Sequence, residues 1–232
     1  MSRIAVIGLD GRPLSREAAG LLEAAALVAG GKRHLLDLAV ELERAVVLEG
    51  DLSAALARIE AENRPVVVLA SGDPAFFGIV RLLGERFGPA ELRVLPAVSS
   101  VALAFARAGV SWDDAVTVSA HGREPRRAVN VCRAHPKVAV LTSPGFGPAE
   151  LAGSLEGLGR TFVVAERLGG PDERVSRGDA GSVAGGSWED PNLVLVLDEG
   201  LASGKGWISS GHESVGRWAL PEDECEHRSG MI

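Results

Sequence analysis

Residues 65–78 read Pro65-Val66-Val67-Val68-Leu69-Ala70-Ser71-Gly72-Asp73-Pro74-Ala75-Phe76-Phe77-Gly78. The run from Val66 to Ala70 has no polar alternation, which predicts a strand covered on both faces, as in a parallel sheet. The loop after it stands where α/β proteins bind ligands, beyond the carboxyl end of a strand. Gly72 permits close backbone approach, and Asp73 offers an acceptor for hydroxyl or ammonium groups. A turn in which Asp73 only caps a helix explains the same residues equally well.

Short apolar strands alternate with helical patterns on both sides of this segment, which predicts an α/β fold of parallel units. Further strands are expected at 4–8, 91–95, 115–119, 138–142, 161–165 and 192–197. Helices are expected after Ser15, at 53–63, at 78–87, from Ser99-Ser100 to Gly109, at 125–134 and at 148–158. We expect an N-terminal α/β domain over residues 1–114, a C-terminal α/β domain over 115–199, and a tail or linker over 200–232.

Composition narrows the class of protein. The chain of 232 residues has a net charge of −7, which argues against nonspecific nucleic-acid binding. No apolar run reaches the length of a membrane span or a secretory signal, and two distant cysteines give no disulfide or zinc spacing. These features predict a cytoplasmic protein without a metal site. The segment Gly200-Leu201-Ala202-Ser203-Gly204-Lys205 departs from P-loop spacing, and no dinucleotide fingerprint follows a strand.

A signature loop and five companion pieces in chain order carry a family resemblance. The loop around Gly72-Asp73-Pro74 resembles the signature of the tetrapyrrole (corrin/porphyrin) methylases, and its companions follow the order of that family. These companions are Gly8 after the first strand, Leu95 to Ser100, Gly109 to Ala115, Ser119-Ala120-His121-Gly122-Arg123, and Leu168 to Arg174. The Trp-Asp-Asp-Ala and Ser-x-His-Gly-Arg pieces are similar to the branch that methylates C5 of precorrin-7. The resemblance covers roughly residues 3–198.

The resemblance implies two α/β domains with S-adenosylmethionine (SAM) bound in the cleft between them. It assigns to the cofactor site Gly8, Gly72, Asp73, Phe76, Ser99, Ser100 and Leu168. Plain capping of a helix is the alternative role for the two serines. Many members carry Gly-Pro-Gly after the first strand, whereas this chain reads Gly8-Leu9-Asp10-Gly11-Arg12-Pro13, so the contacts of that loop are open.

Methyl transfer from a sulfonium needs alignment more than side-chain chemistry. His121 is our candidate for a base, because its ordinary pKa suits proton transfer near neutrality; holding a loop or a substrate carboxylate is the alternative. Arg123 and Arg126, followed by Arg127 and Arg133, are candidates for binding the carboxylates of a tetrapyrrole, or else form a solvated helix face. His34 could contact substrate, although a helix start is the more typical place for it.

Several alternatives remain at this point. The superfamily also contains methylases of RNA and of a protein residue, and a SAM-binding module without catalysis is a different class of answer. The resemblance implies a homodimer. Residues 218–232 resemble the joint before a second module that methylates C15 and decarboxylates a side chain, so the chain is expected to be either stand-alone or the first half of a bifunctional enzyme.

Overall fold

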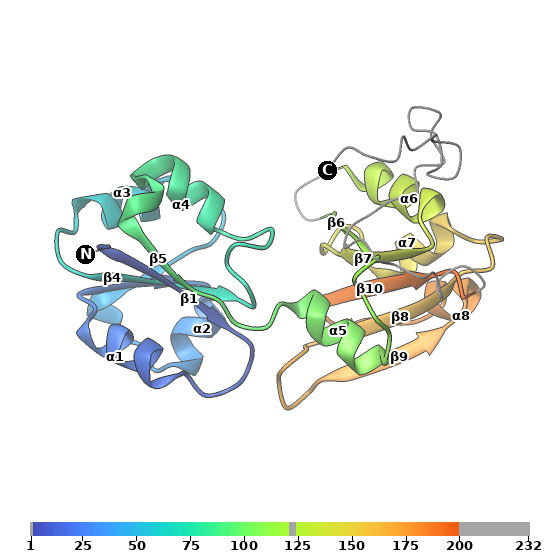
Figure 1. The fold of residues 1–232 in the computed structure, drawn as a ribbon, viewed down its shortest axis with the longest axis horizontal. Helices are drawn as coiled ribbons and strands as arrows, with labels where there is room; N and C mark the ends of the chain where they lie inside the picture. Colours follow the sequence, from blue (N-terminus) through green and yellow to red (C-terminus); the bar gives the residue numbers. More distant parts are fainter. Residues whose placement is uncertain (1, 121–123, 200–232) are drawn as a thin grey trace, which may run out of the picture.

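A computed structural model describes residues 2–120 and 124–199 and contains two sheets in two halves (Figure 1). The first sheet is parallel throughout, with strand order β3-β2-β4-β1-β5. Its strands are β1 (Ile4–Leu9), β2 (Leu27–Gly30), β3 (Ala45–Val47), β4 (Val66–Ser71) and β5 (Leu92–Leu95). The α-helices between them are α1 (Arg16–Ala24), α2 (Lys32–Asp37), α3 (Ser53–Ala61) and α4 (Val80–Phe87), with 3-10 turns at Leu42–Arg44 and Pro89–Glu91.

Both faces of this sheet are buried, as the apolar run in β4 predicts. Ile4 and Val6 pack on one side with Ile59 of α3 and Leu83 of α4. Their neighbours Ala5 and Ile7 pack on the other side, in a core to which α1 and α2 contribute. Successive strand residues point to opposite faces, so one strand supplies both cores.

The second sheet is mixed, with strand order β6-β7-β10-β8-β9. Its strands are β6 (Val116–Ser119), β7 (Lys137–Leu141), β8 (Thr161–Glu166), β9 (Arg174–Gly178) and β10 (Asn192–Leu197). Strand β10 runs antiparallel to β7 and β8, and β9 runs antiparallel to β8. The expectation of parallel units throughout was therefore wrong here. For β9 the physical reason is its short connection to β8, which allows antiparallel neighbours, whereas parallel ones need a long crossover.

Helices cover both faces of the second sheet. Helices α6 (Pro125–Ala134), α7 (Pro148–Ser154) and α8 (Ala180–Ala184) pack on one face. Helix α5 (Ser100–Ala108) packs on the other through Val101, Ala104 and Phe105. Although α5 precedes the expected boundary near residue 114, its apolar side chains belong to the core of the second sheet. The domain limits themselves, and the tail over 200–232, remain predictions.

None of the helices in the described ranges is long and apolar enough to span a bilayer. Cys132 is buried and reduced within α6, where burial raises the pKa of its thiol to about 12. A thiol with so high a pKa is a packing residue and not a nucleophile.

Candidate functional site

Three loops at the carboxyl edge of the first sheet form one hydrogen-bonded unit. The amide of Gly72 donates to the carbonyl of Leu9 (2.6 Å), and the amide of Ala97 donates to the carbonyl of Gly72 (3.3 Å). The end of β4 therefore bonds to the segments that follow β1 and β5. The structure thus brings the Gly72 loop together with the Ser99-Ser100 segment, as the sequence predicted.

Gly8 and Gly72 make this approach possible. A Cβ on Gly8 would overlap the Gly72 carbonyl and would lie 2.6 Å from the amide nitrogen of Ala97. Gly72 adopts φ 60°, and a Cβ there would lie 3.2 Å from Cα of Ser99. A side chain at Gly8 would therefore force the loops apart and one at Gly72 would strain them, so these glycines allow the close packing of the three loops.

Asp73 supports the loop and keeps one acceptor available. Its Oδ1 accepts a hydrogen bond from the amide of Ala75 (2.9 Å), which closes a turn. Helix α4 begins only at Val80, so Asp73 does not cap it. The second carboxylate oxygen has no partner among the described residues, and the side chain is only partly buried. An acceptor of this kind can receive a hydroxyl or ammonium group from a ligand.

The two serines have different environments. The Ser99 hydroxyl accepts from the amide of Ala102 (3.1 Å) and is the N-cap of α5. Capping, the alternative weighed for both residues, therefore describes the Ser99 side chain. Ser100 is the exposed first residue of α5, and its hydroxyl has no partner within the described part of the chain.

Asp10 is a residue of the candidate site that could not be identified from the sequence. Its nearly buried carboxylate accepts from the amide of Val98 (3.3 Å) and from Nε of Arg12 (2.9 Å). The hydrogen bond from Arg12 lowers the pKa of Asp10 below its ordinary value. Asp10 thereby fixes the segment before α5 to the loop after β1. The only available signal was its place in the loop that departs from Gly-Pro-Gly.

The second half meets this edge at three points. The loop after β1 touches the turn after β8, where a Cβ on Gly11 would overlap the carbonyl of Gly169. Phe76, from the loop after β4, and Leu168, from the turn after β8, are partly buried against the core that α5 shares with the second sheet. Figure 1 shows β1 and β4 running toward the second half. The predicted residues Gly8, Gly72, Phe76, Ser99 and Leu168 therefore lie around this junction.

Glu173 fixes the turn that carries Leu168. Its Oε2 accepts from the amide of Gly169 (2.8 Å), and its carboxylate also pairs with Arg107 near the end of α5. The hydrogen bond from Arg107, followed by that from Gly169, lowers the pKa of Glu173. Helix α5 thus positions the junction at both ends, through Ser99 at its start and through Arg107 near its end.

We predict that Glu173 contributes stability that depends on pH. A lowered folded-state pKa stabilises above the unfolded pKa, about 4.3, and the contribution disappears as the pH falls through the folded value. Thermal unfolding should show Glu173→Gln less stable than wild type at pH 7, with the difference shrinking at about pH 3. Glu85→Gln, an exposed change on α4, is the control. A pH-independent difference for Glu173→Gln would contradict this role.

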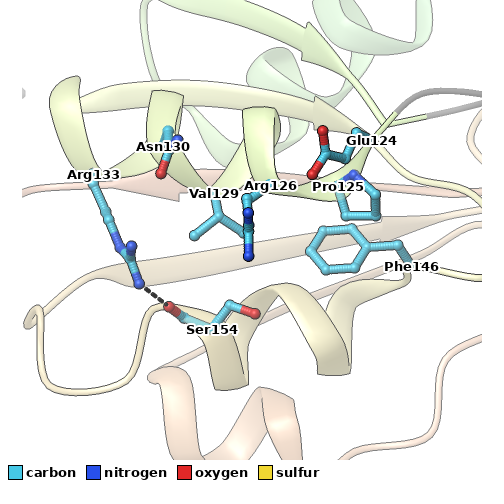
Figure 2. Close-up of a pocket in the computed structure, with 8 residues that line it drawn as sticks. All are labelled: Glu124, Pro125, Arg126, Val129, Asn130, Arg133, Phe146 and Ser154. Atoms are coloured by element: carbon cyan, nitrogen blue, oxygen red, sulfur yellow. Dashed lines mark hydrogen bonds between the residues drawn. The ribbon is translucent and has the colours of Figure 1, made fainter.

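Other predicted residues lie elsewhere. His121 and Arg123 fall outside the described residues. Arg126, Arg127 and Arg133 are exposed on α6, which covers the face of the second sheet opposite α5. Arg126 and Arg133 line an open groove of about 500 Å³ between α6 and α7 (Figure 2). The guanidinium of Arg133 donates to the carbonyl of Ser154 (3.1 Å), so this arginine joins the two helices.

The Trp112-Asp113-Asp114 piece has a structural role. The buried ammonium of Lys137 pairs with Asp114 (2.5 Å) and donates to the carbonyl of Ser111 (3.0 Å). Trp112 stacks on Phe105 of α5 with ring centroids 6.3 Å apart. Within the described ranges, no cluster of His, Cys, Asp and Glu could hold a metal ion.

These features define an α/β protein whose candidate site is the glycine-rich junction where the carboxyl edge of a parallel sheet meets a second, mixed sheet, the place where α/β enzymes usually bind ligands. Residues 7–184 match the tetrapyrrole (corrin/porphyrin) methylases, and the chain belongs to this family. It is therefore a SAM-dependent methyltransferase.

Two curated relatives support the assignment. The chain is 42% identical over 186 residues to a precorrin-6Y C(5,15)-methyltransferase (decarboxylating) from Sinorhizobium sp.. That match covers 73% of this chain but only 43% of the relative, so the chain spans less than half of that protein. It is 34% identical to the cobalt-precorrin-7 C(5)-methyltransferase of Salmonella typhimurium, over 86% of this chain and 100% of the relative.

Among solved structures, a cobalamin-biosynthesis precorrin-6Y methylase from Archaeoglobus fulgidus has a TM-score of 0.63 at 27% identity. The similarity covers 85% of this chain and 98% of that one. It extends over both halves, so the two-domain α/β fold expected from the sequence is confirmed.

Proposed function

We propose that this chain transfers a methyl group from SAM to C5 of precorrin-7, or of its cobalt form, in cobalamin biosynthesis. The observation that supports this most strongly is the match over the whole length of a cobalt-precorrin-7 C(5)-methyltransferase. The chain spans less than half the length of the larger decarboxylating relative, so the second activity of that protein is not part of this proposal. The alternatives are another acceptor within the superfamily, RNA or protein, and a SAM-binding module without catalysis.

The residues at the junction fit SAM. Gly8 and Gly72 let the loops after β1, β4 and β5 approach one another closely, and the free oxygen of Asp73 and the hydroxyl of Ser100 can bond polar groups of the ligand. Ser99 contributes through backbone, since its hydroxyl caps α5. Phe76 and Leu168 supply apolar contact and backbone for the adenine. In this proposal these seven residues form the cofactor site.

When bound, SAM supplies an electrophilic methyl group that an electron-rich pyrrolic carbon can attack. The chain's own task is then to align donor and acceptor and to exclude water, which alone can provide a large acceleration. The methylated ring must lose one proton, and His121 is the proposed acceptor. Arg123 and Arg126 are proposed to bind substrate carboxylates. We further propose a cytoplasmic homodimer, with a C15-methylating, decarboxylating module as a possible fusion partner or associate.

The test combines a binding measurement with product analysis. Incubation with SAM and precorrin-7 should add the mass of one methyl group, and carbon-13 label from the methyl donor should appear at C5. No methyl gain on precorrin-7, despite SAM binding, would reject this acceptor and favour one of the alternatives. No SAM binding at all would reject the function entirely.

Asp73→Ala should weaken SAM binding by about 10-fold to 150-fold, because a hydrogen bond to a charged group is typically worth about 1.5–3 kcal/mol. Isothermal titration calorimetry measures the change directly. Asp113→Ala removes an equally charged, exposed side chain away from the junction and should bind SAM as wild type does. Equal affinities for the two variants would exclude Asp73 from the cofactor site.

A further inference from the structure

The segment Gly31–His34 lies at the same sheet edge as the proposed cofactor loop. Strands β2 and β4 are parallel neighbours in register, with Ala29 opposite Val68. The chain leaves β2 at Gly30 and enters α2 at Lys32, while β4 ends at Ser71. Because both strands end at one edge, the first residues of α2 stand beside the loop that contains Gly72 and Asp73.

A side-chain contact fixes this neighbourhood. Nε2 of His34 lies 2.8 Å from the hydroxyl of Ser71, the residue immediately before Gly72. His34 is partly buried, and Ser71 is exposed at the edge. Burial, assisted by the charge of Arg33 and opposed by that of Asp37, lowers the pKa of His34. The imidazole is therefore neutral near pH 7 and serves as a hydrogen-bonding group, so Lys32 and Arg33 carry the positive charge here.

Lys32 and Arg33 are exposed cations, and no carboxylate of the described residues lies within ion-pair distance of either. Neither has a hydrogen bond or an ion pair with any described residue. Elsewhere in a chain of net charge −7, exposed arginines commonly have partners: Arg86 pairs with Glu60, and Arg93 with Glu17. Two adjacent cations at this edge, without an ion pair among the described residues, attract an anionic ligand, and the guanidinium of arginine suits bidentate binding of a carboxylate.

We propose that Lys32 and Arg33 bind a peripheral carboxylate of the tetrapyrrole on the side of the first sheet, and that His34 is a positioning residue that holds them beside the cofactor loop through Ser71. This inference rests on the proposed function, since it identifies part of the acceptor site. It gives the acceptor a contact in the first half of the molecule. The arginines proposed above to bind substrate carboxylates, Arg123 and Arg126, both belong to the second half of the chain.

The test is the double variant Lys32→Ala/Arg33→Ala, assayed with precorrin-7 and saturating SAM. We expect the KM for precorrin-7 to rise about tenfold with kcat nearly unchanged, as for the loss of exposed ion pairs that contribute to ground-state binding. The rise should be smaller at high salt, because screening already weakens these contacts in wild type. The SAM dissociation constant, measured by calorimetry without precorrin-7, should stay at the wild-type value.

The matched control is Arg58→Ala/Arg86→Ala, which removes the same charge. Arg58 and Arg86 lie in the last turns of α3 and α4, whereas Lys32 and Arg33 lie in the first turn of α2. Its KM should equal that of wild type. An unchanged KM for Lys32→Ala/Arg33→Ala would overturn the proposal. A weakened SAM affinity in that variant would overturn it too, because the carboxylate bound would then be that of the cofactor.

His34 is tested by rescue. His34→Ala and Ser71→Ala should each raise the KM for precorrin-7, whereas His34→Gln, which can still bond Ser71, should recover most of the loss. Equal defects in His34→Ala and His34→Gln, or a normal KM in Ser71→Ala, would contradict the positioning role. If wild type does not methylate precorrin-7, the proposed function fails; if it does and these variants behave as wild type, only the present inference fails.

Discussion

Gly8→Ala should abolish measurable SAM binding while leaving the protein folded. The new Cβ would overlap the Gly72 carbonyl and lie 2.6 Å from the amide nitrogen of Ala97, and both atoms are backbone in the loops that form the junction. The loops must separate to accept it, so the cofactor surface is lost. Overpacking of this kind also costs about 1–3 kcal/mol of unfolding free energy.

Calorimetry with SAM and urea unfolding measure these two effects separately. Gly20→Ala is the matched control, since Gly20 lies in α1 with no atom within 4 Å of the added Cβ. That change should bind SAM normally and stabilise by about 0.5–1 kcal/mol, because alanine loses less conformational freedom than glycine in a helix. Normal SAM affinity in Gly8→Ala would mean that the junction does not form the cofactor site.

Asp114→Ala should reduce the free energy of unfolding by about 3–5 kcal/mol, because it leaves the buried ammonium of Lys137 without its counter-charge. Lys137 is 1% exposed, so water cannot replace the lost carboxylate. The double variant Asp114→Ala/Lys137→Met removes both charges and should recover much of the loss, since an apolar side chain of similar length fills the site. Urea unfolding of wild type, both single variants and the double variant completes the cycle.

If the double variant were as unstable as Asp114→Ala, the unpaired ammonium of Lys137 would not be the cause of the lost unfolding free energy. Full SAM binding is expected in all of these variants at temperatures where they are folded, because Asp114 and Lys137 lie outside the junction. Normal SAM binding in these variants would assign the Trp-Asp-Asp piece a structural role that is separate from the cofactor site, although both segments contribute to the family resemblance in the sequence.

The sequence predicted those elements whose signals are local. Helix α6 begins at Pro125 and ends at Ala134 as expected, because proline favours the first turn and the apolar positions follow helical spacing. Helix α5 was predicted from Ser99 and Gly109, which do stand at its two caps. The apolar run before Gly72 likewise predicted strand β4 and the loop that follows it.

Elements without a strong local signal were missed. Strand β3 has three residues and α2 has six, too short for a period to be recognised. Strand β9 is mostly exposed, so its apolar pattern is weak, and the reversed direction of β10 depends on pairing between distant segments. The roles of Asp10 and Glu173 escaped for the same reason, since each depends on a partner far away along the chain: Val98 for Asp10 and Arg107 for Glu173.

The most direct measurement is a crystal structure of the chain with S-adenosylhomocysteine, the demethylated form of the donor. The ligand should lie at the junction of the two halves, against the backbone of Gly72, with polar contacts to Asp73 and Ser100 and its adenine beside Leu168. Ligand density at the groove between α6 and α7, or anywhere away from Gly8 and Gly72, would contradict the assignment of the site.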